Sequence, residues 1–248
     1  MDITMINNLI KLTEQSLKHI GNLDDWIDQM FTPIKDYTDT AEDLLYPLKF
    51  LFALRSTVKI KRLKSFISDY AKTIENNEHI SENRTEKLKD YFSKEKNIDC
   101  ISEIIDSALI SRSNKCSSLL GVLAGKLINE KRELTNIEVR ISEALRIMLD
   151  IDLIHFHKLY NFIKTVQIPS ENKRSDFRTH DLYKETDIDS LNLNRFDLEC
   201  TIEKLKGIQV IGYKSGGFGN SGNSWGAFFF NENSKYLFEL IDKSKILN

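Results

Sequence analysis

The chain has 248 residues, of which 41% are apolar and 29% are charged, a balance typical of a soluble protein that buries a core. Its formal net charge of −2 excludes a strong overall field toward nucleic acid or a membrane. Only three cysteines are present and none forms a C-x-x-C pair, which excludes a disulfide framework and a compact zinc knuckle.

The sequence shows no targeting signal, which predicts a cytoplasmic protein. The first residues, MDITMINNLIKLTEQ, lack the basic and apolar regions of a signal peptide. No stretch approaches the roughly 20 apolar residues that a spanning helix needs. Scattered cysteines fit a reducing compartment, so we expect a cytoplasmic protein, with association at the membrane periphery as the alternative.

Helical periodicity dominates the first two thirds of the chain. Proline occurs three times and glycine ten times, with five of the glycines between 212 and 222, so helix breakers are scarce elsewhere. Apolar spacing and capping residues predict the helices. They cover 3–20, a segment after Pro33, a segment from Thr40, 58–74, a segment from Ser81 through Phe92, 97–111, 114–130, 136–147, and 150–163 with Asp150 as N-cap.

A different pattern follows the helical part. Residues 169–190 are polar without a helical stripe and are typical of a linker. Beyond them the sequence predicts a helix over 192–205, a strand after Gly207, an aromatic strand over 225–230 and a helix over 234–241. The predicted fold is mainly α, with a multi-helix bundle (1–168), a linker (169–188) and a small α+β module with one β-hairpin (189–248).

The stretch GGFGNSGNSWG at 216–226 formally matches the phosphate-binding pattern G-x-G-x-x-G. That pattern must follow a strand and open a helix, or, in a protein kinase, precede a lysine strand and a catalytic loop. Here a strand follows, and only 26 residues remain after Gly222. We therefore interpret the stretch as the tip of a hairpin and expect no cofactor.

The order of elements after residue 189 resembles the second half of a winged-helix domain. A helix ends at Leu205-Lys206-Gly207-Ile208, and two strands flank a Gly/Asn/Ser loop before a last helix. The resemblance implies a recognition helix and a wing. The partner-binding candidates are Arg195, Lys204, Lys214, Phe218 and Trp225.

The charges of this module favour a protein partner over DNA. Residues 171–248 hold 11 basic and 12 acidic side chains, whereas DNA affinity depends on neutralising phosphates. We expect binding to a protein partner or self-association, and keep a DNA-binding regulator as an alternative.

A basic and apolar stretch covers residues 44–64, LLYPLKFLFALRSTVKIKRLK. From Lys49 to Lys64 it has six basic residues and no acid. Such a stretch is typical of a membrane-interface contact, of a site for an acidic partner, or of a core helix followed by a solvated basic face. The contact candidates are Arg55, Lys59, Lys61, Arg62 and Lys64.

Two shorter motifs have structural interpretations. Gly121-x-x-x-Gly125 places two glycines one turn apart, which predicts a close helix–helix approach. The stretch DIDLIHFH at 150–157 places Asp152 and His155 on one helix face, but it lacks the i, i+4 histidine pair of many zinc helices. We expect half-buried polar histidines, no metal ligand and no catalytic residue.

Residues 112–160, SNKCSSLLGVLAGKLINEKRELTNIEVRISEALRIMLDIDLIHFHKLY, resemble bacterial abortive-infection proteins of the Abi-alpha-like type and, more loosely, TerB-like tellurite-resistance domains. The resemblance implies a bacterial setting and a role in phage defence without a defined reaction. Together these observations predict a non-catalytic interaction protein, with a membrane-interface effector, a DNA-binding regulator and an enzyme with a site assembled across the bundle as alternatives.

Overall fold

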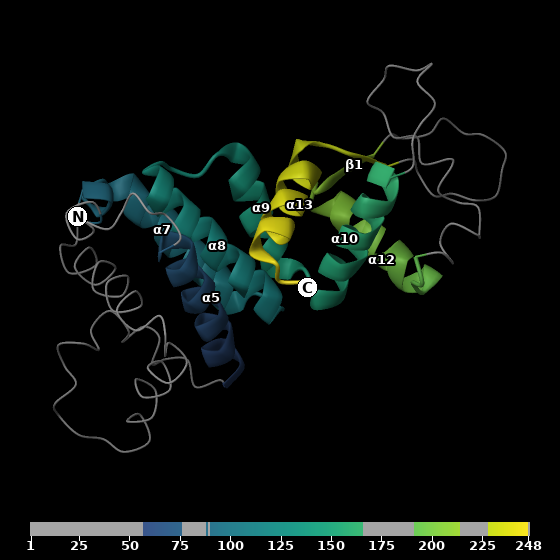
Figure 1. Cartoon of the computed structure of the whole chain (residues 1–248), viewed down its shortest axis with the longest axis horizontal. Coiled ribbons are helices and arrows are strands. Elements are labelled where there is room, and N and C mark those ends of the chain that lie inside the picture. Colours follow the sequence, from purple (N-terminus) through teal and green to yellow (C-terminus); the bar gives the residue numbers. More distant parts are fainter. Residues whose placement is uncertain (1–56, 76–87, 89, 166–190, 214–227, 248) are drawn as a thin grey trace. The chain divides into compact units, whose positions relative to one another are not determined.

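The structure is a computed structural model that describes residues 57–75, 88, 90–165, 191–213 and 228–247 (Figure 1). Within these residues the chain is mainly helical, with one small antiparallel sheet near the C-terminus. Its contacts divide the chain into two compact units, Met1–Thr135 and Asn136–Asn248. None of the described helices combines the length and the apolar composition that crossing a membrane requires.

The described part of the first unit is built around three long helices. The predictions over 58–74 and 114–130 are confirmed, and the helix predicted over 97–111 begins two residues earlier. The helices are α5 (Thr57–Glu75), α7 (Glu95–Ile110) and α8 (Asn114–Glu130).

Helix α8 has defined ends. At its start the side chain of Ser113 accepts a hydrogen bond from the backbone N–H of Cys116, which satisfies one of the free donors of the first turn. At its end Lys131 adopts a left-handed conformation with φ 51°, and its N–H donates to the carbonyl of Ile128. These ends fix the length of the helix on which the first unit packs.

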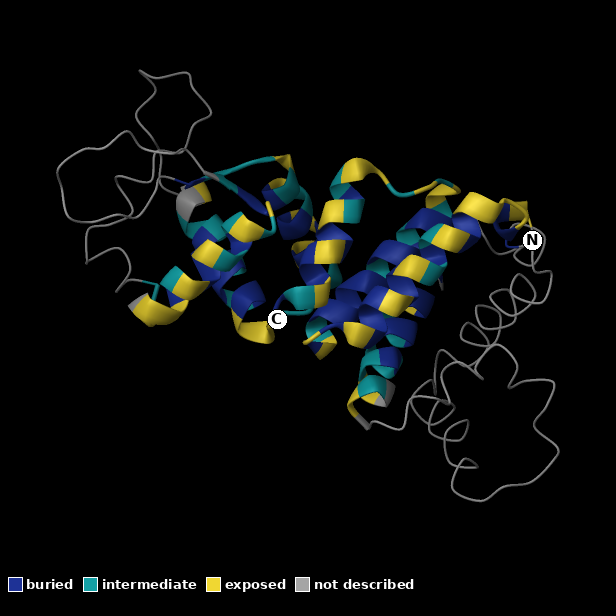
Figure 2. Ribbon diagram, turned by 180° about the vertical axis from the view of Figure 1, so that it is seen from behind, coloured by how far each residue is buried: buried dark blue, intermediate teal, exposed yellow. Residues whose placement is uncertain are grey.

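The contact between α5 and α8 depends on the two glycines of the predicted motif. A Cβ on Gly121 would lie 2.2 Å from the carbonyl oxygen of Phe66, and one on Gly125 would lie 2.9 Å from that of Tyr70. The backbones therefore approach more closely than any side chain allows. The prediction of tight helix packing is confirmed. The buried faces of these helices carry the dark blue of Figure 2.

The described part of the second unit combines four helices with the hairpin. Both bounds predicted for 136–147 are confirmed, and the order of helix, strand, strand and helix after residue 192 is confirmed as well. The elements are α9 (Asn136–Ile147), α10 (Asp150–Thr165), α12 (Arg195–Gly207), β1 (Ile211–Tyr213), β2 (Phe228–Phe230) and α13 (Glu232–Ser244).

The two strands pair in the antiparallel register expected of a hairpin. Gly212 lies opposite Phe229, and a Cβ on Gly212 would lie 2.3 Å from the Phe229 ring. The ring therefore occupies the space that a side chain at position 212 would need. The loop 214–227, with the G-x-G-x-x-G match, lies outside the described residues.

An aromatic cluster joins α10 to the hairpin and to α13. The ring of Tyr160 lies 4.7 Å from that of Phe230 and 4.2 Å from that of Phe238, centroid to centroid. His157 stacks on Phe238 at 5.2 Å. Burial raises the pKa of Tyr160, and Glu239 and Glu232 raise it further. Stacked rings of this kind add to the free energy of burying the apolar surface.

Helices α9 and α10 belong to the second unit, because their contacts are with α12 and α13. The predicted linker at 169–188 lies outside the described residues.

Candidate functional site

The most connected buried polar group lies between α10 and α12, and we call it the Asp152 cluster (Asp152, His155, Thr201 and Lys204). One carboxylate oxygen of Asp152 lies 2.5 Å from the Lys204 amine. The Thr201 hydroxyl donates to the other carboxylate oxygen at 3.2 Å. Nδ1 of His155 lies 3.0 Å from the same hydroxyl. The cluster thus ties the two helices together through three side-chain contacts.

Asp152 also closes the start of α10. Its carboxylate accepts a hydrogen bond of 2.7 Å from the backbone N–H of Leu149. The sequence assigned this capping role to Asp150, but the helix already begins at Asp150. The prediction is corrected, because the carboxylate of Asp152, two positions after Asp150, accepts the hydrogen bond from Leu149, the residue that precedes the helix.

The surroundings of His155 disfavour the charged form of its imidazole. The residue is 3% exposed, more deeply buried than the sequence suggested. Burial lowers the pKa of His155, while nearby Asp197 and Asp152 counteract part of that effect. The Thr201 hydroxyl has one proton, which it gives to Asp152, so Nδ1 of His155 is the donor to that hydroxyl.

The Asp152 cluster contains the residue types of a nucleophilic triad in a different order. In a triad the base accepts the proton of the nucleophile, and an acid orients the base. Here the Thr201 hydroxyl lies between the acid and the base and donates to the acid. Asp152 is neutralised by Lys204, and Thr201 is 2% exposed. The arrangement is that of a packing contact between helices.

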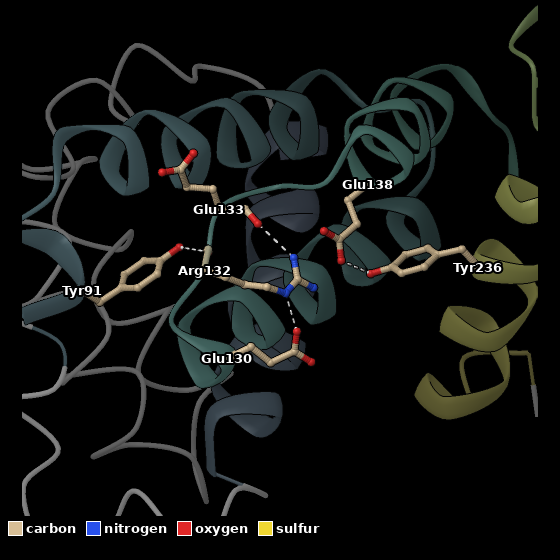
Figure 3. A network of polar contacts seen from close by, with 6 residues as sticks. All are labelled: Tyr91, Glu130, Arg132, Glu133, Glu138 and Tyr236. Carbon is tan, nitrogen blue, oxygen red and sulfur yellow. Dashed lines mark hydrogen bonds and ion pairs between the residues drawn. The ribbon is translucent and has the colours of Figure 1, made fainter.

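Figure 3 shows further polar contacts in each unit, two of which join segments that are distant in sequence. In the second unit the Tyr236 hydroxyl of α13 donates to Glu138 of α9 at 2.5 Å, and Glu138 is 1% exposed. In the first unit the Tyr91 hydroxyl donates to the backbone carbonyl of Arg132 at 3.1 Å. Both fasten a helix to a segment distant in sequence, and neither was predicted, because sequence spacing carries no signal for such pairs.

Helix α12 has one buried side and one side that is exposed to solvent. Leu198, Thr201, Ile202 and Leu205 are buried, whereas Phe196 is 69% exposed. Cys200 and Glu203 follow Phe196 at i+4 and i+7 and are exposed with it, as is the neighbouring Asp197. We call Phe196, Asp197, Cys200 and Glu203 the outer face of α12. Phe196 is the most exposed of the large apolar side chains that the structure describes.

Of the five predicted partner-binding side chains, the structure describes only that of Lys204. Lys204 lies in the Asp152 cluster with a 30% exposed side chain, so its charge is already neutralised inside the unit. The side chain of Arg195 and the residues Lys214, Phe218 and Trp225 lie outside the described residues. Sequence reasoning missed Phe196, although an apolar residue two positions after the N-cap Asn194, off the buried side of the helix, was a signal that could have found it.

The charges on α12 are mostly engaged within the unit. Lys206 forms an ion pair with Glu203 at 2.6 Å, and Lys204 pairs with Asp152. The outer face itself presents the carboxylates of Asp197 and Glu203. Phosphate contacts require exposed Lys and Arg, so this face has the wrong charge for a DNA-reading helix.

A second surface lies at the start of α5, and we call Lys59, Lys61, Arg62 and Lys64 the basic face of α5. Lys61 is exposed and the other three are partly exposed. Val58 is exposed beside them, at 51%. The predicted stretch also contains Arg55, which lies outside the described residues together with the apolar half of the stretch.

No group of three or more His, Cys, Asp or Glu side chains with a geometry suited to a metal ion occurs within the described ranges.

Comparison with known proteins adds no relative. No family model, no curated protein and no solved structure matches this chain. The resemblance of residues 112–160 to abortive-infection proteins and that of the C-terminal elements to a winged helix therefore stay predictions from the sequence.

Proposed function

We propose that this chain is a non-catalytic interaction protein that binds a protein partner through the outer face of α12. The observation that carries the proposal is the 69% exposure of Phe196 in the first turn of that helix. Exposed aromatic side chains are enriched at protein–protein interfaces, where they provide most of the binding free energy.

The helix is held firmly enough to present this side chain. Asn194 accepts a hydrogen bond from the backbone N–H of Asp197 at 3.2 Å, which caps the helix next to Phe196. The Asp152 cluster fixes the buried side of the same helix. A side chain on a fixed helix loses little conformational freedom on binding, so more of its contact free energy appears as affinity.

The charges around Phe196 define the partner's chemistry. Asp197 shares the outer face with Phe196, whereas the carboxylate of Glu203 already pairs with Lys206, so a partner with an apolar pocket and a Lys or Arg beside it is complementary. The same carboxylates repel phosphates, which disfavours the DNA alternative.

The experiment replaces Phe196 by the photoreactive amino acid benzoylphenylalanine, cross-links in the native cells, and identifies the adduct by mass spectrometry. Binding of the identified protein is then measured by calorimetry for Phe196→Asp and for the control Ile151→Asp. Ile151 is an exposed apolar residue of the same unit, on α10.

We expect Phe196→Asp to weaken binding at least about 30-fold, the effect of losing a hot-spot residue, and Ile151→Asp to leave it nearly unchanged. Equal affinities for the two variants would refute the proposal. An adduct between two copies of this chain would identify the partner as a second copy. Salt-sensitive binding of duplex DNA that Phe196→Asp leaves intact would support the regulator instead.

The biological setting that we propose with this function is phage defence, and it rests on the resemblance of residues 112–160 alone. Its test is the plating efficiency of a phage panel on bacteria that express the chain or the Phe196→Asp variant. Protection that the variant loses would join the setting to the outer face of α12.

A further inference from the structure

The basic face of α5 has an uncommon distribution of charge. Its four cations all fall in the first eight residues of the helix, and the first turn contains no acid. Cations near a helix N-terminus are repelled by the macrodipole, which favours anions there. Such a concentration of positive charge costs the isolated helix free energy, and an external anionic surface would offset that cost.

Among the described residues, ion pairs leave three of these four cations, Lys59, Lys61 and Arg62, unneutralised. Within the described residues the ion pair of α5 is Lys72 with Asp69, at 3.6 Å, and both residues lie more than one turn beyond the basic face. No described carboxylate lies within ion-pair distance of Lys59, Lys61 or Arg62. The Nε of Arg62 is buried without a hydrogen-bond partner, and no described carboxylate pairs with this guanidinium.

The apolar residue among these cations distinguishes between anionic partners. Val58 is 51% exposed and lies one turn before Lys61 and Arg62. An apolar side chain surrounded by cations matches the boundary between lipid headgroups and acyl chains. Single-stranded nucleic acid is bound through exposed aromatic rings, but the aromatic residues of α5, Phe66 and Tyr70, are buried.

We infer that the basic face of α5, together with Val58, docks this protein on an anionic lipid surface. The cations provide long-range attraction to the headgroups, and Val58 contacts the interface. Each basic residue near such a surface contributes about a fivefold factor to the partition coefficient. The attraction is Coulombic and weakens with ionic strength.

The experiment is flotation of the full chain with vesicles of phosphatidylcholine, with and without phosphatidylserine, at low and high salt. The test variant changes Lys59, Lys61, Arg62 and Lys64 to Glu. The matched control changes four other basic residues of the first unit to Glu and so alters the net charge equally. These residues are Lys94, Lys96, Arg112 and Lys115, which are exposed or partly exposed.

We expect the wild type to float only with phosphatidylserine and only at low salt. The test variant should lose at least about 100-fold in partition coefficient, and the control variant should stay within about threefold of the wild type. Circular dichroism checks that each variant is helical. If the fourfold variant is unfolded, the single changes Lys61→Glu and Val58→Ser, both at exposed positions, take its place. We expect the partition coefficient to fall about fivefold or more for Lys61→Glu and about threefold for Val58→Ser.

Three results would overturn the inference. They are the absence of flotation of the wild type with phosphatidylserine, equal flotation of the test variant and the wild type, and equal losses for the test and control variants. Displacement of the protein from vesicles by an RNA oligonucleotide at lower concentration than by the lipid headgroup would also overturn it, in favour of nucleic acid. The outcome is independent of the outer face of α12, which Phe196→Asp tests separately.

Discussion

Two helix contacts, one in each unit, are held by different kinds of interaction. Helices α5 and α8 touch at Gly121 and Gly125, where the close approach of two backbones leaves no room for a Cβ. Helices α10 and α12 are joined by the Asp152 cluster, where a buried carboxylate accepts hydrogen bonds from Thr201 and Lys204. The first contact depends on shape and the second on charge.

This difference between a steric and a charged contact predicts which substitutions destabilise each of them. A steric contact tolerates changes of charge and pH, but it fails when volume is added. A buried ion pair tolerates replacement of both partners by apolar groups better than loss of one, because the remaining charge is then left unpaired. The predictions below test these two behaviours against each other.

The largest effect is expected from Asp152→Ala. The substitution leaves the Lys204 amine, the Thr201 hydroxyl and the N–H of Leu149 without their acceptor, which costs about 4 kcal/mol of unfolding free energy. Denaturant unfolding measures this loss, and hydrogen exchange locates it to the second unit. The double variant Asp152→Leu with Lys204→Leu should recover more than half of it; a double variant as unstable as the single one would argue against a charge-based contact.

Gly121→Ala should destabilise the first unit by about 2–3 kcal/mol, because the new methyl group meets the backbone carbonyl of Phe66 and α5 must move away from α8. The control is Gly207→Ala, where a Cβ would meet nothing within 4 Å. That change should alter stability by about 0.5 kcal/mol or less. Hydrogen exchange of peptides from α5 and α8 measures the effect, and equal exchange in both variants would contradict a steric contact.

The same chemical change, removal of a tyrosine hydroxyl, can be made in each unit by Tyr236→Phe and Tyr91→Phe. The Tyr236 hydroxyl donates to the buried carboxylate of Glu138, whereas the Tyr91 hydroxyl donates to a backbone carbonyl. Hydrogen bonds to charged groups are worth more, so we expect losses of about 2 and about 1 kcal/mol. Chemical denaturation of the two variants measures both losses, and the reverse ranking would be inconsistent with a charged Glu138.

The smallest expected effect is a pH dependence of the second unit. Burial lowers the pKa values of His155 and His157 below the ordinary 6.5, so between the lowered values and about 6.5 the unfolded chain binds more protons than the folded one. Stability is therefore full above about pH 6.5 and is lost as the pH falls toward the lowered values. The described part of the first unit contains no histidine.

Denaturant unfolding at a series of pH values between 7 and 5 measures this dependence. His155→Asn and His157→Asn should each reduce the slope of the unfolding free energy against pH, and the double variant should remove nearly all of this slope. A slope that persists in the double variant would assign the dependence to other groups.

The sequence predicted the local structure closely. The glycine-poor, periodic segments over 114–130 and 136–147 became helices with those bounds. The Gly121-x-x-x-Gly125 motif became a close helix contact. These features depend on spacing within about one helical turn, on capping residues and on the absence of helix breakers, and all of these can be read along the chain.

The candidate surfaces were only partly predictable. The basic face of α5 was visible as a run of cations, because its members are close in sequence. Phe196 was overlooked, because its exposure depends on which side of α12 packs against α10. Lys204 was predicted as a partner contact, but it pairs with Asp152, 52 residues earlier.

The sequence by itself therefore determined the helical class, the bounds of most of the described helices to within two residues, the hairpin and the glycine contact, since each follows from residues that are neighbours along the chain. Only the tertiary structure decided that α9 and α10 pack with the last elements of the chain. It alone decided that Thr201 and Lys204 complete the surroundings of Asp152, and that Phe196 faces outward. These outcomes depend on which faces of distant helices meet, and the free energy of burial that selects them is a property of the whole unit.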